Sequence, residues 1–280
     1  MNAQLLRNHG GPEFFYRCYT QAETLMSSNT ILWITTFFMV AGGLLILAIG
    51  KRRTPTENIH TVMHGIVPLI AACLYFCMAS GQGLVMLPTD TAVAAGAATP
   101  TRVFYFARYI DWTFTTPLLL VSLGLTAMRN GPKKDHGAIL GAVLADVMMI
   151  LTAFAFGASE QAWTKWTWFI ISCAAFLGVY YVIFKPQMEA NRRERNDIQS
   201  NYRNEAIVLS ILWFAYPIIL AVSADGLNIV SDAFSVGVIA ILDTLAKVVY
   251  GLWSVASDTK MTDRDLTETR PAVATTRLAS

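Results

Sequence analysis

Long apolar stretches alternate with short polar breaks along the chain. Seven of them exceed about 18 residues, the length at which a helix crosses a hydrocarbon core of roughly 30 Å. They cover residues 27-50, 57-82, 104-128, 136-158, 163-185, 206-224 and 233-256. Lipid offers no partner to backbone N–H and C=O groups, and the stretches are too long for barrel strands, so each is predicted to be a helix. The pattern therefore predicts an all-α membrane protein, a bundle of seven transmembrane helices.

The polar ends of the chain delimit a single predicted domain, residues 25-256. Segment 1-24 precedes it, and the tail 257-280, rich in Thr, Arg and Asp, is expected to be disordered. Only 14% of the residues are charged and 54% are hydrophobic, as expected for a protein solvated by lipid. The net charge of +2 gives no sign of a nucleic-acid partner. The four cysteines exclude a disulfide scaffold and form no convincing ligand set, so no metal site is expected.

Basic residues indicate the orientation of the bundle. The first, third and fifth connections hold Lys51, Arg52, Arg53, Arg129, Lys133, Lys134, Lys185, Arg192, Arg193, Arg195 and Arg203. The opposite connections hold only Arg102 and Lys165. Because basic loops stay in the cytoplasm, segment 1-24 is predicted to be extracellular and the tail cytoplasmic.

Five ionisable residues lie at membrane depth, where they are costly and by default mark function: Arg108, Asp111, Asp146, Asp243 and Lys247. Asp243 and Lys247 are one helical turn apart on a shared face. Structural salt bridges are one interpretation of these charges. The alternative is chemical: a desolvated lysine amine can form a Schiff base with an aldehyde, and the protonated imine then needs carboxylate counterions.

Three runs resemble the microbial (type 1) rhodopsins. They are RYIDWTFTTPLLL at 108-120, WFAYP at 213-217 and LDTLAK at 242-247, in the third, sixth and seventh predicted helices. The resemblance extends over roughly residues 27-256. It implies all-trans retinal bound to Lys247 as a protonated Schiff base, in a light-driven transporter rather than an enzyme. It also implies the plasma membrane of a bacterium, the inner membrane, and a homo-oligomer, a trimer or pentamer.

The resemblance further implies which residues surround the chromophore. A polyene needs a narrow slot of flat apolar groups, although each such residue alone could be ordinary core. The expected walls are Trp112, Thr116, Leu119, Met149, Trp168, Ser172, Phe176, Trp213, Tyr216, Pro217 and Ala246. Tyr75 and Tyr216 are expected to hydrogen-bond the counterion. By resemblance, leucine at position 119 indicates absorption of green light. Relatives that bind a carotenoid antenna have a glycine where this chain has Phe169, so no antenna is expected.

The third helix favours protons as the cargo. By resemblance, Asp111 is the proton acceptor, and Arg108 compensates the negative charges of Asp111 and Asp243. Thr115 is placed to hydrogen-bond Asp111, or alternatively its own helix backbone. These features predict an outward proton pump.

Ser122 departs from the commoner outward pumps, which carry Asp or Glu about 16 Å inward of Asp111 along the helix. Serine cannot serve as a comparable proton donor. His64 and His60 on the second helix reach about this depth, and imidazole titrates near neutrality. The chain resembles a bacterial subgroup with Gly or Ser at this place and a compensating second-helix histidine. We predict that His64 and Ser122 relay the cytoplasmic proton and that His60 extends the path; the alternative is that the histidines only satisfy a helix end.

On the outer side, Asp225 and Asp232 are candidates for proton release, or else plain loop residues. Three other activities remain open. One is a photosensory rhodopsin with a slow photocycle, and another is an inward proton pump, whose members usually have proline in place of Asp243. The third is a membrane receptor or transporter without retinal.

Overall fold

Seven membrane-crossing helices build the protein. The computed structural model describes residues 12–89, 101–131 and 135–268. The helices before the fifth connection are α1 (Pro12–Ile49), α2 (Pro55–Ala79), α3 (Phe106–Ala127), α4 (His136–Ala158) and α5 (Ala162–Val182), which continues through the π-helical turn η1 (Ile183–Gln187) into α6 (Met188–Asn191). After it come α7 (Asn196–Val222) and a last helix made of α8 (Asp232–Asp243), the π-helical turn η2 (Thr244–Val249) and α9 (Tyr250–Glu268). Within the described ranges, seven helices are long and apolar enough to cross a membrane, which confirms the predicted bundle.

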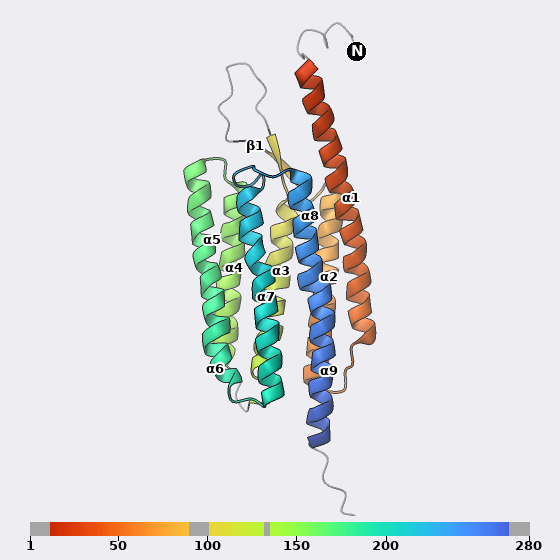
Figure 1. Cartoon of the computed structure of the whole chain (residues 1–280), viewed down its shortest axis with the longest axis vertical. Helices are drawn as coiled ribbons and strands as arrows, with labels where there is room; N and C mark the ends of the chain where they lie inside the picture. Colours follow the sequence, from red (N-terminus) through yellow and green to blue (C-terminus); the bar gives the residue numbers. More distant parts are fainter. Residues whose placement is uncertain (1–11, 90–100, 132–134, 269–280) are drawn as a thin grey trace, which may run out of the picture.

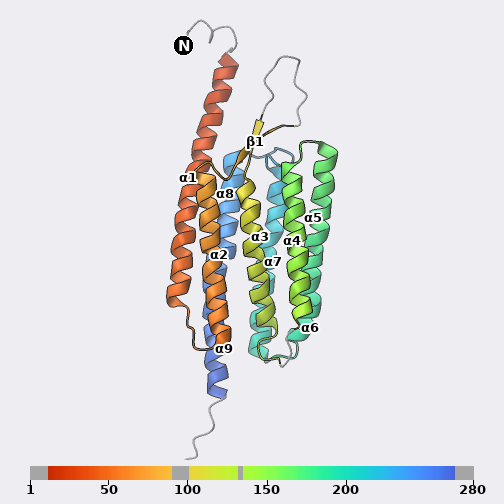
Figure 2. The ribbon, with the colours of Figure 1, turned by 180° about the vertical axis from the view of Figure 1, so that it is seen from behind.

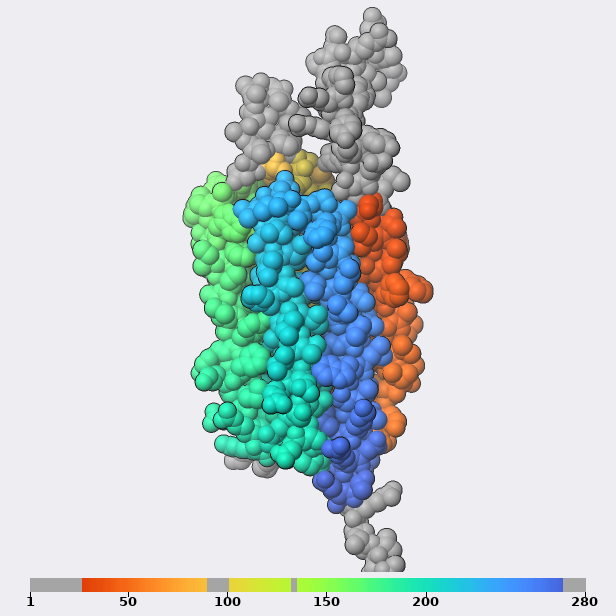
Figure 3. Space-filling view, in the orientation of Figure 1, coloured from red at the N-terminus to blue at the C-terminus, as the bar shows by residue number. Residues whose placement is uncertain are grey.

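The helices form an upright bundle with α3 and α7 in the middle (Figures 1 and 2). On one side of this pair stand α4 and α5, and on the other α1, α2 and the last helix. The space-filling view shows α5, α7, the last helix and α1 packed side by side on one face (Figure 3). Large apolar side chains such as Phe37, Leu144 and Ile211 are exposed, as expected where a helix faces lipid. The end of the bundle that carries the predicted cytoplasmic connections is its cytoplasmic end.

Side-chain caps explain where three helices begin. The Thr54 hydroxyl accepts the Glu57 N–H at 3.2 Å, and Pro55 occupies the first helical position. Asp135 caps α4 by accepting the Ala138 N–H at 3.0 Å. Ser231 caps α8 in the same way. Each cap satisfies an N–H group that has no partner inside the helix.

Several helix boundaries differ from the prediction. The helix α7 begins ten residues before the predicted stretch 206-224. The last helix continues to Glu268, so the expected disorder of the tail is wrong for residues 257–268, and residues 269–280 lie outside the described part. Likewise α1 begins at Pro12, inside the predicted extracellular segment. The prediction was based on apolar runs alone, so it missed helical turns that are built from polar residues.

The prediction also missed a β-hairpin between the second and third helices. The strands β1 (Val85–Pro88) and β2 (Thr101–Phe104) are antiparallel, with Val85 opposite Phe104. They lie over the outer end of the bundle (Figure 1). Phe104 is buried in the core, and the hairpin carries Arg102 to a buried position at this end.

Candidate functional site

Lys247 lies in the middle of the bundle between two carboxylates. Its side chain is 2% exposed and is carried by the turn η2. The Nζ atom forms ion pairs with Asp111 and with Asp243, whose Oδ1 is 3.3 Å away. Both aspartates are fully buried. Taking three charges out of water is costly, so a pairing of this kind is expected only where it serves a purpose.

The two carboxylates differ in their hydrogen bonds. Asp243 accepts from Tyr75 at 2.7 Å, Tyr216 at 2.7 Å and the Trp112 indole N–H at 3.2 Å. These donors come from α2, α7 and α3, so three helices hold this carboxylate in place. The Oδ1 atom of Asp111, by contrast, has no hydrogen-bond partner among the described residues. Asp111 is thus the carboxylate with capacity to accept a proton.

Thr115 and Arg108 take positions that refine the predicted roles. The Thr115 hydroxyl donates to the backbone carbonyl of Asp111 at 2.8 Å, the alternative left open by the sequence. The guanidinium of Arg108 is buried and lies 5.1 Å from the centre of the Tyr105 ring. Within the described chain it makes no ion pair with Asp111 or Asp243, so it can act on them only at longer range.

A cavity of about 70 Å³ extends from Lys247 into the bundle. It is lined by predicted wall residues, namely Trp112, Thr116, Leu119, Met149, Ser172, Phe176, Trp213, Tyr216, Pro217 and Ala246. Further lining residues that the sequence reasoning missed are Ile150, Ala153, Phe156, Cys173 and Leu220. Phe169 also lines it, whereas Trp168 does not. The reason is helical geometry: Phe169, Ser172, Cys173 and Phe176 share one face of α5, and Trp168 is rotated off it by about 100°.

The polar groups of the cavity wall are satisfied within the protein. Thr116 donates to the buried Asp146 at 2.6 Å, and Ser172 donates to the Met149 carbonyl at 2.9 Å. The remaining wall is apolar and rich in rings, with the Lys247 amine at one end. An apolar slot that ends at an amine and two carboxylates fits an apolar aldehyde such as retinal, bound through Lys247.

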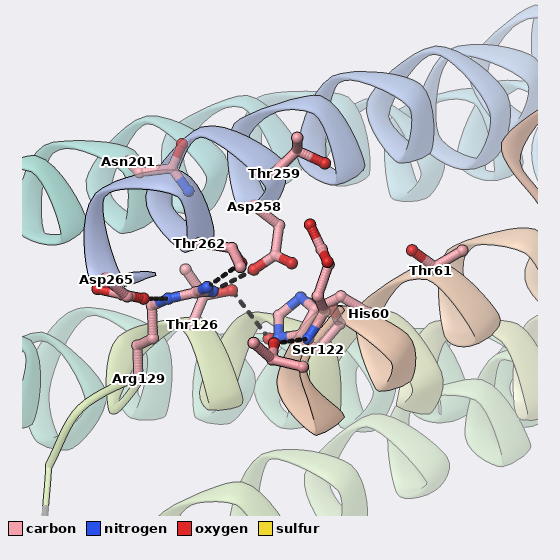
Figure 4. A network of polar contacts seen from close by, with 12 residues as sticks. His60, Thr61, Ser122, Thr126, Arg129, Asn201, Asp258, Thr259, Thr262 and Asp265 are labelled. Atoms are coloured by element: carbon pink, nitrogen blue, oxygen red, sulfur yellow. Dashed lines mark hydrogen bonds and ion pairs between the residues drawn. The ribbon is translucent and has the colours of Figure 1, made fainter. Parts of the chain in front are cut away.

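On the cytoplasmic side of Lys247, two histidines meet at one hydroxyl. Ser122 Oγ lies 3.2 Å from His60 Nδ1 and 2.9 Å from His64 Nε2. All three side chains are buried. Figure 4 shows His60 and Ser122 side by side. Because a hydroxyl has one proton to donate, at least one imidazole must donate its own N–H to Ser122. The cluster can therefore pass a proton from ring to ring.

The second nitrogen of His64 lies beside the last helix. His64 Nδ1 has no hydrogen-bond partner among the residues that the structure describes. It lies 3.6 Å from the point that a Cβ at Gly251 would occupy. Gly251 follows Lys247 by four residues, about one turn of helix. The cluster of His60, Ser122 and His64 thus reaches the last helix about one turn beyond Lys247, counted along the helix.

An ion network lies at the cytoplasmic end (Figure 4). Arg129 pairs with Asp258 and with Asp265 at 2.9 Å, and donates to Thr262 at 2.6 Å. The sequence marked Arg129 only as a basic residue of a connection. It is in fact buried, because α9 continues past the end of α3 and covers it.

The two outer release candidates are bonded rather than free loop residues. Asp225 is buried, pairs with Arg102 and lies 3.5 Å from the Tyr109 hydroxyl. Burial raises the pKa of Asp225, and the charge of Arg102 opposes that rise. Asp232 accepts from Ser28 at 2.8 Å and from Tyr105 at 3.1 Å. These contacts depend on the hairpin and on α1, which the sequence could not place.

Comparison with known proteins gives concordant matches. The family described as bacteriorhodopsin-like protein matches residues 26–261. Archaerhodopsin-2 of Halobacterium sp. is 31% identical over 79% of this chain and 82% of the relative. Bacteriorhodopsin of Halobacterium salinarum is 35% identical over 67% of this chain and 66% of the relative.

Solved structures agree with the sequence relatives. A light-driven proton pump from Leptosphaeria maculans has a TM-score of 0.76 and 29% identity, covering 84% of this chain and 96% of that one. The thermophilic rhodopsin from Rubrobacter xylanophilus has a TM-score of 0.75 and 33% identity, covering 84% and 98%. The chain therefore belongs to the bacteriorhodopsin-like family of retinal-binding membrane proteins.

Proposed function

We propose that this protein is a light-driven outward proton pump, with Asp111 as the proton acceptor of Lys247. The observation that carries the proposal is the order of titratable groups along the bundle. Asp111 lies against the Lys247 amine, and the cluster of His60, Ser122 and His64 lies on its cytoplasmic side. A proton that leaves Lys247 for Asp111 can thus be replaced from the opposite side. The relatives from Leptosphaeria maculans and Coccomyxa subellipsoidea, both described as light-driven proton pumps, support the same cargo.

Retinal bound to Lys247 supplies light absorption and an isomerisation that changes the surroundings of the Lys247 nitrogen. The protein residues then determine where the proton goes. Asp111 accepts it, because its Oδ1 has no other described partner. Asp243 is less available to the proton, because its oxygens already accept hydrogen bonds from three donors. Arg108 balances the remaining negative charge from the outer side.

Return of the proton uses the histidine cluster. His64 Nδ1, which lies beside Gly251, gives a proton towards the Lys247 nitrogen. The Ser122 hydroxyl refills His64 at Nε2 and takes a proton from His60 Nδ1. This chain of proton transfers replaces the single carboxylate that commoner outward pumps place at position 122. Release to the outside uses Asp225, which Arg102 tunes, or Asp232.

The setting of the pump is part of the proposal. A multi-pass protein with these basic cytoplasmic connections fits a bacterial inner membrane. We expect it to assemble there as a homo-oligomer, a trimer or pentamer.

Light-induced pH change in an unbuffered suspension of cells that express the full chain with all-trans retinal tests the proposal. We expect acidification that a protonophore abolishes, and none with Asp111→Asn. Lys247→Ala should stay colourless, which controls for chromophore binding. Alkalinisation in the light would show that the protein pumps protons inward and would refute the proposed direction. A coloured protein without any pH change would instead favour a photosensor.

A further inference from the structure

Glu205 on α7 is a buried carboxyl group that the proposed pump leaves without a role. Its side chain is 1% exposed, and it accepts a hydrogen bond from Asn201 at 3.0 Å. The guanidinium of Arg129 acts on it electrostatically but pairs with Asp258 and Asp265. A buried carboxyl group without a cation of its own is cheaper to keep neutral than ionised. Glu205 is therefore expected to carry a proton in the resting protein.

Tyr250 connects Glu205 with the histidine cluster. The charge of Glu205 acts on Tyr250, whose ring centre lies 5.8 Å from that of His64. Tyr250 is 2% exposed, so this contact lies inside the bundle. Three helices that are distant in sequence, α7, α9 and α2, thus bring one carboxyl group close to the His64 imidazole.

On its other side, Glu205 is connected with the cytoplasmic surface. Asp258 also acts on its carboxyl group, and Asp258 pairs with Arg129. Arg129 in turn holds Asp265, whose side chain is 25% exposed. Figure 4 shows Asn201, Asp258, Arg129 and Asp265 at this end of the bundle. Asp265, Arg129 and Asp258 therefore form a series of polar groups between the cytoplasmic surface and Glu205.

We propose that Glu205 is a proton-relay residue that recharges the cluster of His60, Ser122 and His64 from the cytoplasm. The inference rests on the proposed function, because it names the source of the proton that the cluster transfers to the Lys247 nitrogen. The carboxyl group gives its proton to the cluster, and the carboxylate that remains regains one through the surface network. Five groups face Glu205 and set how readily it does so: Asn201 on α7, Tyr250, Ser254 and Asp258 on α9, and Arg129 after α3.

Flash photolysis of Glu205→Gln in the full chain with retinal tests this inference. Glutamine keeps the size and the hydrogen bond with Asn201 but cannot give up a proton. We measure recovery of the initial absorption and proton uptake with a pH dye between pH 5 and 9. Recovery of the original protein should depend little on pH, because the donor is internal. Recovery of the variant should be at least about tenfold slower at neutral pH and slow by about tenfold per pH unit, because protons then come from bulk water.

A matched control is Glu194→Gln. Glu194 is also a buried glutamate of the cytoplasmic end, but it accepts backbone N–H groups of Asn130 and Gly131. Its recovery should keep the pH profile of the original protein. Azide, a small weak acid, should speed the recovery of Glu205→Gln, since it carries protons into the bundle. A purely structural role of Glu205 would not give this rescue.

The outcomes separate this inference from the proposed function. Unchanged recovery and pH profile in Glu205→Gln overturn the role of Glu205, even where His64→Gln slows recovery. Absence of light-driven acidification by the original protein overturns the pump itself. If Glu205→Gln forms no pigment, Glu205→Asp replaces it. That variant keeps a carboxyl group and should recover independently of pH but more slowly than the original protein, and a rate equal to the original overturns the inference.

Discussion

Removing one hydroxyl group, in Ser122→Ala, is the sharpest perturbation of the proposed return path. Ser122 Oγ is the atom on which His60 Nδ1 and His64 Nε2 converge, at 3.2 and 2.9 Å. Alanine keeps the helix and removes only this oxygen. The two imidazoles then lose their shared partner inside a buried site, and no side chain joins them.

The magnitude follows from the two lost hydrogen bonds. Each contributes about 0.5–1.5 kcal/mol net, so together they amount to about 1–3 kcal/mol. If this energy is lost from the transition state of proton return, recovery slows by roughly fivefold to 150-fold, since 1.36 kcal/mol corresponds to a factor of ten. The colour of the pigment should not change, because Ser122 does not line the cavity at Lys247.

Flash photolysis at neutral pH measures the effect as the recovery time of the initial absorption. Thr126→Val is the matched control, because it removes a hydroxyl one turn further along α3 that donates only to the Ser122 backbone carbonyl at 3.2 Å. Its recovery should match that of the original protein. Equal recovery times in Ser122→Ala and Thr126→Val would refute the view that the hydroxyl joins the histidines.

Three further predictions concern other parts of the molecule. In Gly251→Ala the new methyl group would lie 3.0 Å from Ile46 Cδ1 and 3.6 Å from His64 Nδ1 and crowd the His64 ring, so recovery should slow several-fold at unchanged colour; an equal rate would exclude a transfer path past Gly251. In Arg102→Gln the cation that opposes the raised pKa of Asp225 is lost, so this pKa should rise further and the infrared band of the protonated carboxyl group should persist to higher pH. An infrared band that disappears at the same pH as in the original protein would contradict this role of Arg102. Arg129→Gln breaks a buried pair and should lower the unfolding free energy by about 3–5 kcal/mol, seen as a lower melting temperature; an unchanged melting temperature would mean that the pair is exposed to water.

The sequence predicts the features that depend on residues close together along one helix. Seven apolar runs predict seven helices, because each run is long enough to bury itself in lipid. The spacing of Asp243 and Lys247 predicts their contact, since four residues make about one turn. The depths of His64 and Ser122 could be counted along α2 and α3, and the structure brings both to one hydrogen bond.

Features that depend on packing between distant segments could not be predicted. Glu205 lies in a polar stretch before the sixth apolar run, and it is buried in the bundle near Tyr250 and Asp258 of α9. Asp225 and Arg102 meet because a hairpin folds over the outer end. A polar residue in a connection gives no sign of whether another element will cover it.

The π-helical turn η2 has a consequence for how the last helix can change during evolution. One residue beyond the α-helical count is accommodated between Thr244 and Val249. Deleting a single residue there would restore a regular helix and leave the part after it in register, because the wide turn absorbs the extra residue. Gly251 and Asp258 would then keep the positions that they occupy beside His64 and Arg129. A one-codon deletion in this turn would therefore alter the surroundings of Lys247 while leaving the residues of proton supply in place.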